Sequence, residues 1–150
     1  MLKMIFVIGA LLAIAVNHVA SAAQPASYAG QEQREIKALS PEEIRDYLAG
    51  KGMGLAKAAE LNRYPGPAHV LELAEKLRLD AEQRARSEAI FSAMQADAVR
   101  QGRLLVEKER ELDRLFAGGG VTSEDLRAAL EQIGCLQAEI RRIHLQVHIE

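Results

Sequence analysis

The sequence has few aromatic residues, with no tryptophan, three phenylalanines and three tyrosines among its 150 residues. Sheet proteins depend on aromatic and β-branched side chains, which pack well on a pleated surface. Alanine, glutamate, leucine and arginine dominate this chain instead. The composition therefore predicts an all-α protein.

Cysteine is also scarce, because Cys135 is the single one in the sequence. An intramolecular disulfide is therefore excluded. Two interpretations remain, a buried thiol within a helix and a disulfide between the two copies of a dimer. We favour the buried thiol, because free cysteines are commonly buried.

A strong excess of either charge is missing, since the net charge is −2 and both signs are interspersed. Nucleic-acid-binding proteins carry a basic patch, so we expect no nucleic acid as a partner. The sequence also lacks a catalytic set. It has no serine with a nearby histidine and aspartate in a strained turn, no glycine loop after a strand, and no evident base beside Cys135. We therefore expect no enzymatic activity.

The chain begins like a secretory signal peptide. Lys3 precedes an apolar run from Met4 to Val16, and small residues follow. Ala20 and Ala22 satisfy the A-x-A rule, which predicts a signal peptide over residues 1–22 that is cleaved after Ala22. The apolar run is short for a membrane span, which needs about 20 residues, but an uncleaved signal that anchors the chain in the inner membrane remains the alternative.

A flexible leader is predicted over residues 23–39, because this segment is polar and has no apolar period. Ser40 then provides an N-cap, Pro41 occupies the first helical position, and Glu43 completes a capping box. A short helix is predicted from there to Ala49. Further short helices are predicted over residues 55–61 and 68–77, on either side of a "YPGP" turn.

Two long amphipathic helices are predicted in the second half. Asp80 caps the first, with Gln83 three residues on, and this helix runs to Phe116. The sequence "AGGG" ends it, and Thr122 or Ser123 caps the second. Each helix has an apolar stripe, formed by Phe91, Met94, Ala98, Leu105, Leu112 and Phe116 in the first and by Leu126, Leu130, Ile133, Ile140, His144 and Val147 in the second.

Two such helices joined by a tight glycine turn form an antiparallel hairpin. A hairpin has too few layers to bury its own apolar stripes, even where the short helices cover part of them. We therefore predict one helical domain over residues 40–150 that completes its core as an elongated homodimer.

The stretch "GMGLAKAAELNRYPGPAHVLELAEKLRLDAEQRARSEAIF" is followed by a long charged helix, a glycine break and "LQAEIRRIHLQVHIE". This arrangement, over residues 52–150, resembles the periplasmic heavy-metal resistance and sensor proteins of the CpxP, Spy and CnrX-like group. There, "LRLDAEQ" takes the place of the first LTxxQ-type motif, with Asp80 as an equally good N-cap where threonine is usual. Family members generally continue into a second LTPEQ-type motif and a final helix, whereas this sequence stops at Glu150.

The resemblance implies a periplasmic protein whose long helices form a hooked or cradle-shaped homodimer. It also implies two candidate functions in envelope stress. The first is binding of a transition metal by a sensor or resistance protein, which implies a membrane signalling protein as partner. The second is an ATP-independent holdase chaperone that binds unfolded envelope proteins and whose histidines are incidental.

His144 and His148 are the main candidate metal ligands. They lie four residues apart on a helix, so both imidazoles face the same way and can converge on zinc, copper, nickel or cobalt. The CnrX-like sensors have metal ligands at a matching spacing in this stretch. The alternative is that a carboxylate satisfies His144 in the helix seam and that His148 lies at a frayed end. Two histidines are also fewer ligands than a zinc site usually has.

His69 is the candidate third ligand, because the sensor relatives place ligands at the start of this helix, although they carry two histidines a turn apart. Glu72 or Glu88 could complete such a site. The alternative is that His69 is an ordinary helix N-terminal residue near the "PGP" turn. Met53 and Met94 could serve copper, but Met94 fits the apolar stripe and is better explained as a core residue.

Overall fold

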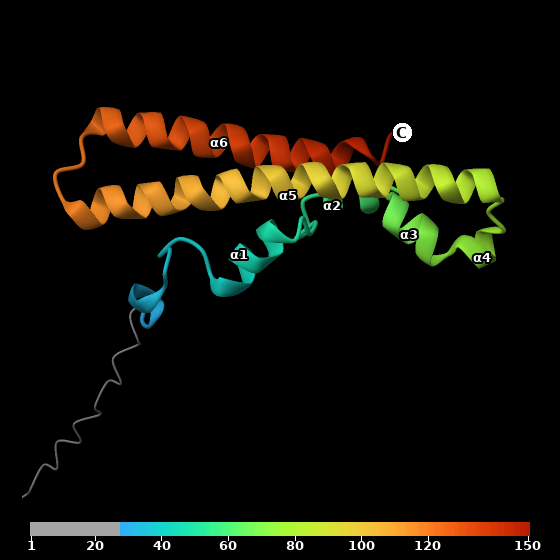
Figure 1. Ribbon diagram of the computed structural model, residues 1–150, viewed down its shortest axis with the longest axis horizontal. Coiled ribbons are helices and arrows are strands. Elements are labelled where there is room, and N and C mark those ends of the chain that lie inside the picture. The colour runs from blue at the N-terminus through green and yellow to red at the C-terminus, as the bar shows by residue number, and fades with distance from the viewer. Residues whose placement is uncertain (1–27) are drawn as a thin grey trace, which may run out of the picture.

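The computed structural model describes residues 28–150 and shows an all-α protein, as the composition predicts. No strand occurs within these residues. A long helical hairpin forms one side of the molecule, and short helices lie against the other side of its first helix (Figure 1). The elements are η1 (Gln31–Gln33), α1 (Pro41–Leu48), α2 (Lys57–Glu60), α3 (Pro67–Glu72), α4 (Ala74–Leu77), α5 (Ala81–Gly118) and α6 (Ser123–Gln146).

The two helices of the hairpin begin where the sequence predicts. Asp80 accepts a hydrogen bond from the Gln83 backbone N–H at 2.8 Å, and Thr122 accepts one from the Asp125 N–H at 3.1 Å. Each N3 side chain bonds back to the N-cap, so both helices start with a complete capping box. With 38 residues, α5 is about 57 Å long at 1.5 Å per residue.

The turn of the hairpin depends on glycine. Gly119 and Gly120 have φ angles of 69° and 76°, a region that side chains with a Cβ disfavour. The chain therefore reverses after α5 without strain, and α6 returns antiparallel beside it (Figure 1).

The short helices differ in part from the prediction. A capping box at Ser40 starts α1 as expected, but α2 covers only four residues, Lys57–Glu60, of the helix predicted over 55–61. The helix predicted over 68–77 is interrupted at Leu73, where φ is −101°, and divides into α3 and α4. Neither glycine nor proline marks this break in the sequence, so local propensity gives no signal for it.

Two clusters of buried residues form the core. Leu105, Ile133 and Ile140 pack between α5 and α6, while Ile36 and Leu39 pack on Val106 on another face of α5. Ile36 is fully buried, so the segment predicted as the end of a flexible leader is part of the core. Ion pairs of Glu35 with Arg110 and of Lys37 with Asp113 also join this segment to α5, and its two aliphatic side chains are too few to give a periodic pattern in the sequence.

The predicted apolar stripes are only partly covered. Leu105, Ile133 and Ile140 are buried, but Phe116 and Leu130 are about half exposed, at 55% and 49%. Both lie in the half of the hairpin next to the glycine turn, and α1 and α3 contact α5 further from that turn (Figure 1). The homodimer predicted to cover such surfaces stays a prediction.

Cys135 is exposed on α6, so the prediction that its thiol is buried within a helix is wrong.

The predicted signal peptide, residues 1–22, lies outside the described residues. Within residues 28–150, no helix combines the length and the apolar character that crossing a membrane requires.

Candidate functional site

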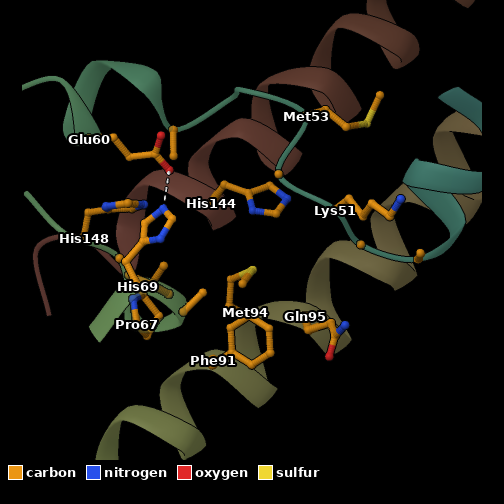
Figure 2. A pocket seen from close by; sticks show the side chains of 17 residues that line it. Lys51, Met53, Glu60, Pro67, His69, Phe91, Met94, Gln95, His144 and His148 are labelled. Atoms are coloured by element: carbon orange, nitrogen blue, oxygen red, sulfur yellow. Dashed lines mark ion pairs between the residues drawn. The ribbon is translucent and has the colours of Figure 1, made fainter. Parts of the chain in front are cut away.

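A pocket of about 460 Å³ lies where the end of α6 meets the segment from the end of α1 to α3. Phe91 and Met94 of α5 form another side of it. His69, His144 and His148, the three candidate ligands from the sequence, all line this one pocket (Figure 2). The fold therefore brings His69 to the α6 pair from 75 residues earlier in the chain, a separation at which sequence spacing gives no information.

His144 is the most buried of the three histidines, with 5% of its surface exposed. It lies one turn after Ile140 on the buried face of α6, and its ring extends into the pocket (Figure 2). Its Nε2 atom is buried and has no hydrogen-bond partner. No carboxylate therefore satisfies this nitrogen, contrary to the alternative for a seam histidine. A buried polar atom without a partner is costly, and such atoms often mark a functional site.

Burial lowers the pKa of His144 below its usual value, because desolvation disfavours the charged ring, and the positive form of His148 lowers it further. His144 is therefore neutral at pH 7. A neutral imidazole has one nitrogen with a free lone pair, which is the form that binds a metal ion.

His148 follows α6, but it is held in place rather than frayed. Its Nδ1 atom lies 2.8 Å from the backbone carbonyl oxygen of Tyr64, so Nδ1–H donates this hydrogen bond and Nε2 carries the lone pair in the neutral ring. Metal-binding histidines are commonly oriented by such a bond from the other ring nitrogen. The ring also packs closely on Gly66, where an added Cβ would lie 2.7 Å from His148 Cε1.

His69 is the exposed member of the set. Its Nδ1 lies 3.2 Å from Glu72 Oε2 and its Nε2 lies 3.9 Å from Glu60 Oε1, an ion pair drawn in Figure 2. Glu72 therefore contacts His69 itself, and Glu88 does not line the pocket. Glu60 is the pocket carboxylate that the sequence did not indicate, because its four-residue helix has no motif.

Met53 and Met94 also line the pocket, together with apolar and small residues. The Met94 sulfur lies on the side of its side chain that faces His144, whereas the Met53 sulfur points away from the histidines (Figure 2). Met94 is half-buried on α5 rather than fully enclosed. The expectation that it acts as a core residue thus describes only part of its position.

The donor atoms surround the pocket without forming a ready-made metal site. Among residues 28–150, no three His, Cys, Asp or Glu side chains already lie together as metal ligands. His144 and His148 are fixed by burial and by the Tyr64 carbonyl, whereas the exposed His69 side chain has room to change rotamer. The donors present are imidazoles, one carboxylate and thioethers, which suit zinc, copper, nickel or cobalt better than magnesium or calcium.

Comparison with protein-family models, with curated proteins and with solved structures finds no match for this chain.

Proposed function

We propose that this protein binds a transition-metal ion in the pocket between α6 and the α2–α3 segment, as a metal sensor or resistance protein of the cell envelope. The observation that carries the proposal is the buried Nε2 atom of His144, which has no hydrogen-bond partner and belongs to a residue that lines a pocket together with His148 and His69. Leaving a buried polar atom unpaired destabilises the fold by about 1–3 kcal/mol, and a bound metal removes that cost.

The states of His144 and His148 support this proposal. The neutral His144 ring has one nitrogen with a free lone pair, and the hydrogen bond from His148 Nδ1–H to the Tyr64 carbonyl oxygen leaves Nε2 as the acceptor of a neutral His148 ring. His69 and Glu60, which lie beside each other in the same pocket, are further candidate donors. Zinc, copper, nickel and cobalt all accept this mixture of nitrogen and oxygen ligands.

The setting of this function is part of the proposal. The signal-peptide pattern of residues 1–22 supports a location in the periplasm, or on the inner membrane if the signal is retained. There it acts without enzymatic activity as a homodimer, and metal occupancy is communicated to a membrane signalling protein.

Calorimetric titration of the full chain with zinc, copper, nickel and cobalt tests the metal site. Binding of at least one metal is expected, and His144→Ala combined with His148→Ala should abolish it. Gln132→Ala, an exposed change elsewhere on α6, is the matched control and should bind as the unchanged protein does. Affinity that survives the double histidine change would overturn the assignment.

A second variant tests the site while keeping every histidine. Gly66→Ala puts a methyl group 2.7 Å from His148 Cε1, so the ring must move. Gly66 has a φ of −84°, which alanine adopts without strain, so the backbone tolerates the change. Metal affinity should fall although the helical circular dichroism is unchanged. An unaltered affinity would exclude His148 as an oriented ligand.

A holdase chaperone is the second candidate function, and the exposed apolar surface favours it. The large hydrophobic residues that are exposed include Leu48, Leu61, Tyr64, Leu73, Leu77, Leu104, Leu115, Phe116, Leu130 and Ile149. Groups of exposed apolar side chains mark surfaces that bind partners. Suppressed aggregation of a denatured client by the metal-free protein, equally in the double histidine variant, would support this function. No suppression at a several-fold molar excess would exclude it.

A further inference from the structure

The pocket contains a donor that the histidine pattern leaves out. Met94 lies on α5, and its thioether sulfur faces His144 in the same pocket (Figure 2). Thioether sulfur is a soft, uncharged ligand, and among the metals that the pocket's donors suit it favours Cu(I) most. We propose that the pocket selects Cu(I), held by His144, His148 and Met94. This inference rests on the proposed function and specifies its metal.

The charges around the pocket agree with a monovalent ion. A histidine binds a metal as the neutral ring and a thioether carries no charge, so the bound ion keeps its full charge in a pocket lined largely by apolar groups. Burying a charge is costly, and the cost rises with the charge on the ion. Cu(I) therefore loses less hydration energy here than a divalent ion does.

The charged side chains that line the pocket already have partners. Lys51 forms a 2.7 Å ion pair with Asp46, which lies outside the pocket. Glu60, the one carboxylate lining the pocket, is already paired with His69.

The small number of fixed donors also fits this ion. Within the described residues, no three His, Cys, Asp or Glu side chains are arranged for a metal, and a structural zinc site usually has four ligands. Two imidazoles and one thioether complete a three-coordinate site without help from His69. The buried Nε2 of His144, a residue that lines this pocket, has no hydrogen-bond partner, and this observation is independent of Met94.

The test compares Cu(I) and zinc binding to the full chain with and without the thioether. Cu(I) is titrated anaerobically against a colorimetric Cu(I) chelator, and zinc against a colorimetric zinc chelator. Met94→Leu conserves side-chain volume, so the fold should survive. We expect it to weaken Cu(I) binding by about tenfold or more, as losing a metal-supporting group commonly does, and to leave zinc affinity unchanged.

Met53→Leu is the matched control, because Met53 lines the same pocket while its sulfur points away from the histidines (Figure 2). It should leave both affinities unchanged. X-ray absorption at the copper edge gives a second measurement. We expect a sulfur neighbour at about 2.3 Å, an ordinary metal–sulfur distance, that disappears in Met94→Leu.

Each failure has a distinct meaning. If zinc binds more tightly than Cu(I), or if Met94→Leu leaves Cu(I) affinity and the copper spectrum unchanged, the inference is overturned while a histidine-based metal site stands. If Cu(I) does not bind the unchanged protein the inference fails, and if zinc, nickel and cobalt do not bind either, the proposed function fails with it.

Discussion

At the scale of single residues, the candidate site depends on the burial of His144 and on the hydrogen bond that orients His148. The four-residue spacing of His144 and His148 could be read from the sequence, but the prediction that one helix carries both is wrong, because α6 ends at Gln146 and His148 lies in the turn that follows. The burial of His144 and the anchoring of His148 by Tyr64 could not be predicted, because they depend on residues distant in the sequence, with Met94 50 residues before His144 and Tyr64 84 residues before His148. The same holds for Glu60, which has no local motif, whereas Met94 is a possible copper ligand from the sequence whose place on the apolar stripe favoured a core role.

The low pKa of His144 predicts a loss of stability in acid. The unfolded chain takes up a proton near pH 6.5, whereas desolvation delays protonation of the folded state. As the pH falls below 6.5, the unfolded chain therefore binds this proton more readily than the folded chain does. The free energy of unfolding decreases until the pH reaches the lowered pKa that His144 has in the folded protein. The decrease is about 1.4 kcal/mol for each unit by which the pKa is lowered.

Urea denaturation of the metal-free protein at pH 7.5 and pH 5.5 measures this effect. His144→Leu keeps an apolar group in the buried site and should lose less stability between the two pH values than the unchanged protein. His148, His69 and Glu60 also line the pocket and are present in both proteins. Equal losses in the two proteins would show that His144 is not the group responsible.

For the buried carboxyl group of Glu109, the predicted change of stability with pH has the opposite sign. This side chain of α5 is 8% exposed, and desolvation raises the pKa of its carboxyl group. Above pH 4.5 the unfolded chain releases this proton more readily than the folded chain, so stability falls as pH rises toward the raised pKa. Glu109→Gln should therefore raise the free energy of unfolding at pH 7 by about 1 kcal/mol.

Thermal and urea unfolding measure that change, with Glu131→Gln as the control. Glu131 is exposed and paired with Arg127 on α6, so its replacement should change stability by less than about 0.5 kcal/mol. A destabilised Glu109→Gln protein would mean that the carboxylate makes a stabilising interaction in the fold.

At the scale of elements, helix starts were easier to predict than helix packing. The capping boxes at Ser40 and Asp80 can be recognised from residues three apart, and both are present. For the last helix the sequence left Thr122 and Ser123 as alternatives, and Thr122 is the cap, forming a third box with Asp125. No comparable sequence motif predicts the contact of α1 with α5. It depends on Gly102, which lies outside the predicted stripe because glycine contributes no apolar side chain.

Gly102 and Gly134 form a matched pair for testing that contact. An added Cβ at Gly102 would lie 2.2 Å from the Tyr47 carbonyl oxygen, whereas nothing lies within 4 Å of one at Gly134. Gly102→Ala should lower the free energy of unfolding by about 1–3 kcal/mol, because rigid backbone of α1 must move. Gly134→Ala should raise it by about 0.5–1 kcal/mol through helix propensity. Urea denaturation that ranks the two variants the other way round would contradict the packing of α1 on α5.

At the scale of the whole molecule, the hairpin is longer than the layer that covers it. The all-α class and the antiparallel pairing could be predicted from periodicity and the glycine turn, and both hold. How far the short helices extend along α5 could not be predicted, since it depends on contacts distant in sequence. Apolar residues that the short helices do not cover stay exposed, among them Leu104 and Leu115 on one face of α5.

This exposed face predicts association into a homodimer. Sedimentation equilibrium at micromolar concentration should give about twice the mass of one chain, because covering apolar surface stabilises the dimer. Leu104→Ser combined with Leu115→Ser should shift the protein toward monomer. Leu61→Ser is the control, because Leu61 is exposed near α2 and away from that face. A monomeric mass for the unchanged protein would contradict the prediction.

The central claim is that a metal ion bonds to the ring nitrogens of His144 and His148. Long-range proton–nitrogen correlation spectra of histidine-labelled protein, recorded at pH 7.5 with zinc, with Cu(I) and without metal, test it most directly. Before metal is added, His148 should carry its proton on Nδ1 and His144 should be neutral. With a bound metal, the Nε2 resonances of both rings should shift together at one equivalent. Ring nitrogens of His144 and His148 that stay unchanged with both metals would contradict the account.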